Sequence, residues 1–173
     1  GMLRMDVFEA VKTLLAVREY QEKPIPPETI ERIVEAGHLT ASSMNKQPRR
    51  FIVVDDRETL KKIGSLVKTG PYIAGAAMAV AVAIEKSSKF AVSDASRAIQ
   101  DMLLVAWADG IGGNWTGFHG LDAVNPVLGI SDEMDLLAIL PFGYPANPVG
   151  KGEKKRKPRS EVVFRGRYGQ PFS

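Results

Sequence analysis

The sequence predicts an α+β fold with a central mixed sheet flanked by helices. Residues 77–84 form an uncharged apolar run of alternating small and large side chains, which is typical of a central strand buried on both faces. Other segments show apolar residues at helical spacing, but strands and helices do not alternate regularly as in a doubly wound fold. The 173 residues are 45% hydrophobic, which is enough for a single domain over residues 2–173 with a sizeable core.

Two helices are expected before the first strand. Residues 6–16 carry an apolar stripe at helical spacing. Residues 27–37 follow a proline-rich stretch, and Pro27 suits the first turn of a helix because an N–H has no partner there. Gly37 is the expected end of this second helix.

The first strand and the third helix follow closely. Residues 51–54 are apolar and are expected to form a strand. Asp55 and Glu58 have the spacing of a capping box, which predicts a helix that begins there and continues to Val67. The Gly-Pro pair at residues 70–71 should end this helix.

The longest expected helix covers residues 94–109. Ser93 precedes it as a candidate N-cap, and Gly110 follows it as a terminator. Apolar side chains line one side of this segment, which indicates a buried face. Residues 111–116 are rich in glycine and are expected to be extended.

The C-terminal third is expected to hold a short helix or turn at 121–128, a strand at 136–142 and a last short strand at 161–164. Residues 151–159 hold six basic side chains and one acidic one. The net charge of this segment is therefore larger than the net charge of +3 for the whole chain. A nucleic-acid-binding protein more commonly spreads cations along a face and adds stacking aromatic side chains. A small phosphate ligand or a solvated tail fits one basic segment better, so we expect no nucleic-acid partner.

Composition and missing motifs narrow the possible functions. The chain has no cysteine, and its two histidines, His38 and His119, lie far apart, so no metal site is expected. No apolar run has the length of a membrane span and no signal peptide is recognised, so we expect a cytoplasmic protein without membrane contact. Phosphate-loop and nucleophile-elbow motifs are missing too. An enzyme of this sequence would therefore take its reactive atoms from a bound cofactor.

A polar loop precedes the strand at 51–54. Two serines, an asparagine and a glutamine within residues 42–47 offer several hydrogen-bond donors and acceptors. Binding residues concentrate on loops of this kind when a rigid scaffold holds them. The same residues also suit an ordinary capped loop before a strand, and both interpretations stay open at this point.

Several stretches, in the same order along the chain, resemble the motifs of the nitroreductase family of FMN-dependent oxidoreductases. The stretches are residues 13–20, 24–28, Ala41-Ser42-Ser43-Met44-Asn45 with Gln47-Pro48, 94–104, Gly110 to Phe118, 140–145, and Lys154-Lys155-Arg156-Lys157-Pro158. Each motif alone is weak, but their shared order over most of residues 5–168 is specific. The resemblance implies the nitroreductase fold, an FMN cofactor, and a homodimer in which the C-terminal strand is exchanged with the partner subunit.

At the FMN phosphate, the resemblance implies roles for Arg18, Lys154 and Arg156. Guanidinium and ammonium groups suit a phosphate dianion. Each residue also has a plainer interpretation: Arg18 as a cation at a helix C-terminus, and the other two as part of a solvated charge run. Leu14 and Ala16 stand where the family has an arginine and a serine, so two polar ligands near the FMN tail are missing.

At the flavin ring, the resemblance implies that Ser42, Ser43 and Asn45 make contact from the partner subunit. Thr116 and Gly117 match positions where the family places backbone near the reactive flavin nitrogen, and glycine permits a close approach. The plainer interpretations are loop capping for the first three residues and a tight turn for the last two.

The implied activity is that of an NAD(P)H oxidoreductase. NAD(P)H delivers hydride to the flavin, and a small-molecule electron acceptor such as a nitroaromatic compound or a quinone then takes the electrons in a ping-pong cycle. No catalytic side chain is assigned, because the protein orients and tunes the ring. Arg49 replaces the family's aromatic residue after Gln-Pro, and both lower FMN affinity and compensation by Arg49 stay open. The alternatives are a non-catalytic flavin or phosphate-ligand binding protein of the same fold, and a nucleic-acid interaction module with a basic tail.

Overall fold

The computed structural model describes residues 5–118, 120–150 and 153–173. Its helices are α1 (Val7–Thr13), α2 (Pro27–Leu39), α3 (Arg57–Leu66), α4 (Ala91–Ala108), α5 (Asn125–Leu128) and α6 (Arg159–Val162). Its strands are β1 (Arg49–Val54), β2 (Met78–Glu85), β3 (Gly112–Gly113) and β4 (Met134–Gly143). Short 3-10 turns cover Ser43–Asn45, Pro71–Gly75 and Asp122–Val124. His119 and the first two residues of the basic segment lie outside the described residues.

The four strands form one sheet in the order β1-β2-β4-β3, and each neighbouring pair is antiparallel. After α1, the chain forms a parallel bridge from Ala16 to Gly113 at the β3 edge of the sheet. The expected mixture of parallel and antiparallel pairing therefore occurs at that edge. The side chains of β2 are buried from Met78 to Ile84. This confirms the central strand that its uncharged apolar run predicts.

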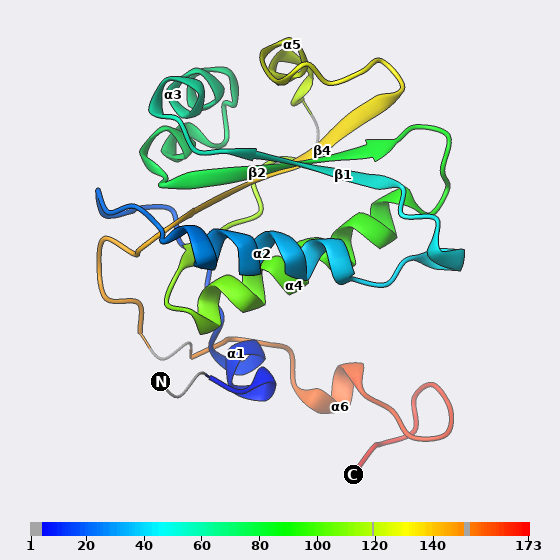
Figure 1. Ribbon diagram of the computed structural model, residues 1–173. Helices are drawn as coiled ribbons and strands as arrows, with labels where there is room; N and C mark the ends of the chain where they lie inside the picture. The colour runs from blue at the N-terminus through cyan, green and yellow to red at the C-terminus, as the bar shows by residue number, and fades with distance from the viewer. Residues whose placement is uncertain (1–4, 119, 151–152) are drawn as a thin grey trace.

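Helices cover both faces of the sheet, which confirms the α+β class (Figure 1). The helices α2 and α4 lie on one face, and α3 and α5 lie on the other. Alternate side chains of β2 therefore enter two cores: Met78 and Val80 point toward α2 and α4, and Ala79 and Ala81 point toward α3. Burial of one large aliphatic side chain contributes roughly 1.5–3 kcal/mol, so these two cores give the site loops a rigid support.

Gly37 lies inside α2 and does not end it, contrary to the expectation from sequence. A Cβ atom at this position would lie 2.8 Å from the Met102 sulfur. The missing side chain lets α2 pack closely against α4, and this contact explains the glycine. The helix continues to Leu39, after which the Thr40 hydroxyl donates to the Ala36 carbonyl at 2.7 Å.

Three other helix boundaries differ from the expected ones. The helix α1 ends at Thr13, because the chain becomes extended to reach the bridge at the sheet edge. Asp56 and not Asp55 caps α3, since its carboxylate accepts a first-turn amide at 2.9 Å. The helix α4 begins at Ala91, so Ser93 lies within its first turn and does not cap it.

The expected last strand at 161–164 is wrong in this structure. Residues Arg159–Val162 form the single turn α6, which follows Pro158. Phe164 forms an isolated bridge to Pro171 and a ring contact with Tyr168, both within its own segment. The C-terminal segment lies beyond α1, away from the sheet, so it does not pair with a described strand of its own chain (Figure 1). Exchange of this segment with a partner subunit stays a prediction.

Candidate functional site

The polar loop between α2 and β1 has an unusual backbone. Met44, Asn45 and Gln47 have φ angles of 52°, 55° and 52°, in the left-handed region that residues other than glycine rarely adopt. Each such residue costs about 1–2 kcal/mol. Other contacts must therefore hold the loop in this shape, and strained backbone of this kind clusters at ligand-binding sites.

Asp94, in the first turn of α4, holds this loop from below. The residue is 1% exposed, and its two carboxylate oxygens each accept from the Ser43 amide at 3.1 Å, while one accepts from the Ser43 hydroxyl at 3.2 Å. Within the loop, the Gln47 amide donates to the Ser42 hydroxyl oxygen at 3.0 Å, and the Gln47 side chain donates to the Asn45 carbonyl at 3.1 Å. The three predicted residues Ser42, Ser43 and Asn45 therefore share one cross-linked loop.

Arg49 ties the two ends of the loop together. It is 5% exposed, and its guanidinium donates to the carbonyls of Asp94 at 2.8 Å, Ala41 at 3.3 Å, Gly37 at 3.5 Å and Thr40. Burial lowers the pKa of Arg49, and the Asp94 charge opposes this shift. The guanidinium is thus committed to backbone carbonyls, and it acts as a loop anchor where the family has an aromatic residue.

Thr116 lies in a buried polar cluster beside the sheet. Its amide and carbonyl pair with Ile139 of β4, both at 2.9 Å. Its hydroxyl shares a hydrogen bond of 2.9 Å with the Tyr72 hydroxyl, which also accepts from the Asn114 side chain at 2.7 Å. The polar groups of Thr116 are engaged within the chain, so this residue fixes the position of the next one, Gly117.

Gly117 combines a tight turn with an available donor. Its φ is +80°, and a Cβ atom would lie 2.8 Å from the Leu121 side chain. The Trp115 indole donates to the Gly117 carbonyl at 2.5 Å. Within the described part of the chain, the half-buried Gly117 amide donates to no acceptor. The turn geometry therefore accounts for the glycine, and it leaves one backbone N–H for a ligand.

Two of the predicted phosphate-binding cations, Lys154 and Arg156, lie where the C-terminal segment passes α1 (Figure 1). The Lys154 ammonium donates to the Val11 carbonyl at 2.7 Å. Burial lowers the pKa of Lys154, and the positive charge of Arg156 lowers it further. Arg156 is exposed and donates to the Lys155 carbonyl at 3.0 Å, while Arg18 is exposed in the extended chain after α1. The structure thus places two of these three cations together and the third beyond the end of the same helix.

The cations and the polar loop lie near opposite ends of α4. Ser43 is bound to Asp94 in the first turn, whereas α1 is attached near the other end by a hydrogen bond of 2.8 Å from the Trp107 indole to the Thr13 hydroxyl. At 1.5 Å per residue, Asp94 and Trp107 are about 20 Å apart along the helix. One chain therefore does not bring all the predicted site residues together.

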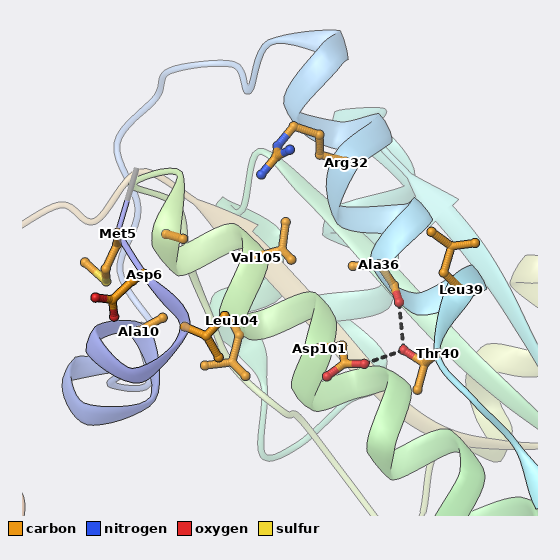
Figure 2. A pocket seen from close by; sticks show the side chains of 12 residues that line it. Met5, Asp6, Ala10, Arg32, Ala36, Leu39, Thr40, Asp101, Leu104 and Val105 are labelled. Atoms are coloured by element: carbon orange, nitrogen blue, oxygen red, sulfur yellow. Dashed lines mark hydrogen bonds between the residues drawn. The ribbon is translucent and has the colours of Figure 1, made fainter. Parts of the chain in front are cut away.

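A hollow of about 410 Å³ lies between α1, α2 and α4, mostly lined by apolar side chains (Figure 2). On its α4 side, the Thr40 hydroxyl also lies 2.6 Å from a carboxylate oxygen of Asp101, so its single proton is shared between this oxygen and the Ala36 carbonyl. The eight predicted site residues are absent from the described residues that line this hollow. Val7 and Phe8 on α1 and Leu39 on α2 are 78%, 73% and 72% exposed, so the hollow belongs to a larger apolar surface.

Sequence reasoning missed Asp94 and Tyr72 as parts of the site. A signal for Asp94 was present: it is a charged residue on the same helical face as Ala91, Ala95 and Ala98, all of which are buried. Tyr72 carried no such signal, because its contact with Thr116 joins segments that are far apart in sequence. In the described residues, no helix is long and apolar enough to cross a membrane, and no cluster of His, Asp and Glu could hold a metal ion.

These elements define an α+β protein whose polar loop, Gly117 turn and exposed cations are the candidate binding groups. A sequence profile of the nitroreductase family matches residues 15–85 and 68–144, and the chain belongs to this family. A protein from Methanothermobacter thermautotrophicus, provisionally named NADH dehydrogenase/NAD(P)H nitroreductase, is 35% identical over 155 residues, which cover 85% of this chain and 81% of that protein.

Two solved structures show the same fold. A Parabacteroides distasonis protein with the same provisional name has a TM-score of 0.84 at 26% identity, over 92% of this chain and 98% of the other. A Desulfovibrio desulfuricans protein, provisionally named a nitroreductase and solved in complex with FMN, has a TM-score of 0.81 at 25% identity, over 93% of this chain and 96% of the other. The similarity therefore extends along nearly the whole of each chain.

Proposed function

We propose that this protein binds FMN and uses NAD(P)H to reduce a small-molecule electron acceptor, such as a nitroaromatic compound or a quinone, by ping-pong hydride transfer. The observation that carries the proposal is the Gly117 amide. It has no acceptor among the described residues, and it belongs to a half-buried residue at the position where the family places backbone near the reactive flavin nitrogen. Because a backbone N–H is a strong hydrogen-bond donor, a ring nitrogen of the cofactor could accept from it.

The chemistry of the remaining residues fits FMN. Arg18, Lys154 and Arg156 supply cations for a phosphate dianion, and a hydrogen bond to a charged group contributes roughly 1.5–3 kcal/mol. Ser42 and Ser43 each keep part of their hydrogen-bonding capacity for a ligand. When bound, FMN supplies the atom that takes hydride from NAD(P)H and passes it on. The chain itself binds the phosphate, orients the ring and holds it against backbone donors.

The site is proposed to form between the two chains of a homodimer. The cations of one chain lie about 20 Å along α4 from the polar loop of the same chain, so a partner subunit would supply the loop to each FMN. The apolar surface around Val7, Phe8 and Leu39 offers a contact area, and Val162 and Tyr168 of the C-terminal segment are 56% and 90% exposed. Each chain is proposed to form a single domain whose C-terminal segment crosses to the partner.

A non-catalytic flavin-binding protein of the same fold is the competing function. One observation favours it: Leu14 and Ala16 offer no polar side chain next to the predicted phosphate site. Weaker binding of the cofactor tail would suit a protein that stores or delivers flavin.

Anaerobic reduction of the FMN-loaded protein separates these functions. We expect NADH or NADPH to bleach the flavin absorbance, and a quinone or a nitroaromatic compound added afterwards to restore it. A protein that binds FMN but keeps it oxidised in excess of both nicotinamides would be the non-catalytic binder. A protein that takes up no FMN would contradict both functions.

A further inference from the structure

We propose that Asp94 is a positioning residue that sets the direction of hydrogen bonding in the Ser42–Ser43 loop. Through Asp94, Ser43 would be restricted to accepting hydrogen bonds from the ligand, while Ser42 would remain free to donate one. The proposal rests on the flavin site proposed above and adds a residue from α4 to it. Asp94 itself does not touch the ligand, because its carboxylate lies under the loop.

The direction at Ser43 follows from the chemistry of a carboxylate. An ionised carboxylate can only accept hydrogen bonds, so the Ser43 amide and the Ser43 hydroxyl must both donate to Asp94, at 3.1 Å and 3.2 Å. The hydroxyl proton is then used, and the remaining lone pairs of the oxygen can only accept. Ser43 therefore suits a donor on the ligand, such as a ring N–H or a ribityl hydroxyl.

The direction at Ser42 is the opposite. Its hydroxyl oxygen accepts from the Gln47 amide at 3.0 Å, and its proton has no acceptor among the described residues. Ser42 therefore suits an acceptor on the ligand, such as a ring carbonyl. A donor and an acceptor on neighbouring residues match the polar edge of a flavin ring, where an N–H lies between two carbonyl groups.

The charge of Asp94 is also balanced locally. Arg97 approaches the carboxylate at 3.6 Å from the next turn of α4, and the buried guanidinium of Arg49 donates to the Asp94 carbonyl at 2.8 Å. A neutral side chain at position 94 would leave these cations without their counter-charge. It would also let an amide group donate to the Ser43 oxygen, which would reverse the hydrogen bond at this residue.

The test compares Asp94→Asn with Asp109→Asn. Asp109 lies directly after the other end of α4, where it pairs with Arg32 at 2.9 Å, so the control also removes an ion pair but leaves the loop intact. Two readouts are needed: FMN affinity by titration of the apoprotein, and hydrogen exchange of the Ser43 and Gln47 amides without FMN. We expect Asp94→Asn to bind FMN at least tenfold more weakly and to lose protection at Ser43, and Asp109→Asn to stay within twofold of wild type.

A double-mutant comparison tests the direction of the bond. Ser43→Ala should weaken FMN binding in the wild-type background and have little further effect on Asp94→Asn, because the two residues act as a unit. If Asp94→Asn does not fold, Ser43→Ala alone still decides: FMN affinity within twofold of wild type would overturn the proposal. Unchanged FMN affinity of a folded Asp94→Asn variant would overturn it too. Failure of the proposed function looks different, because wild-type protein itself would then bind no FMN.

Discussion

At the scale of single residues, the predicted phosphate-binding cations differ in how far the chain already uses them. The Lys154 ammonium donates to the Val11 carbonyl, and Arg156 donates to the carbonyl of its neighbour. Arg18 makes no hydrogen bond within the described residues and is exposed. Arg18 is therefore the cation that a phosphate group can engage at the smallest cost in existing contacts.

Arg18→Ala should weaken FMN binding by about tenfold or more, since a charge-assisted hydrogen bond contributes roughly 1.5–3 kcal/mol. Riboflavin, which has no phosphate, should bind wild type and variant equally. Fluorescence titration of the apoprotein measures both ligands. Arg57→Ala serves as the matched control, because Arg57 is an exposed arginine in α3, a helix on the sheet face opposite α2 and α4. If the Arg18→Ala variant bound FMN as tightly as wild type does, the role of Arg18 at the phosphate would be contradicted.

FMN affinity should also fall at alkaline pH through Lys154. Burial and Arg156 disfavour the protonated amine and lower its pKa below the ordinary lysine value of 10.5. A phosphate dianion favours the protonated form, so bound FMN raises this pKa and the affinity decreases as pH rises through the lowered value. Lys154→Arg keeps the cation charged at all accessible pH values and should remove this dependence. A pH profile that is the same for Lys154→Arg and wild type would show that Lys154 does not contact the phosphate.

At the scale of secondary-structure elements, the short strand β3 positions the chain that leads to Gly117. A Cβ atom on Gly113 would lie 2.8 Å from the Phe142 ring and 2.9 Å from the Leu103 side chain. The same residue bridges to Ala16 in the chain that carries Arg18. Close backbone packing at Gly113 therefore links the sheet edge to two parts of the predicted site.

Gly113→Ala should lower the free energy of unfolding by about 1–3 kcal/mol, the usual cost of an extra methyl group in a packed core. Urea denaturation of the apoprotein measures this change. Gly75→Ala is the control, because a Cβ atom there would meet nothing within 4 Å. If both variants had the same free energy of unfolding, the space around Gly113 would accommodate a methyl group, and this account of the packing at β3 would be contradicted.

The sequence predicted the elements whose pattern is local. The uncharged run of β2 and the apolar stripe of α4 indicate burial wherever the rest of the chain lies, and both are confirmed. The expected last strand is wrong because Val162 to Phe164 have strand-like side chains, whereas pairing depends on contact with a sheet edge, and this segment lies away from the sheet of its own chain. The polar loop was singled out from its residue types, and its role as a site stays a prediction. Asp94 was not assigned a role in the loop, since its contact with Ser43 joins residues 51 positions apart.

At the scale of the whole molecule, three features favour a second chain: the exposed apolar residues, the C-terminal segment that lies away from the sheet, and the separation of the predicted site residues. A second chain would cover Val7 and Phe8, which are more than 70% exposed, and would bring a polar loop to each group of cations. Under the proposed function, assembly and cofactor binding would be coupled, because the complete FMN site would exist only in the dimer.

Sedimentation should therefore show a dimer, and truncation at Ser160 should weaken it. The truncated chain loses the exposed side chains of Val162, Val163 and Tyr168 but keeps the sheet and its cores. FMN affinity should fall together with the dimer affinity, while circular dichroism of the remaining fold stays unchanged. A truncated protein that sediments as a monomer and still binds FMN like the full chain would contradict a shared site.

The most direct test of the shared site is complementation between two defective chains. One chain carries Arg18→Ala, the other carries Ser42→Ala with Ser43→Ala, and the two are co-expressed with different tags so that the heterodimer can be purified. If each FMN is held by the cations of one chain and the loop of its partner, the heterodimer has one intact site and should bind one FMN with wild-type affinity, although both homodimers bind weakly. A heterodimer that binds FMN no better than either defective homodimer would contradict a site formed between two chains.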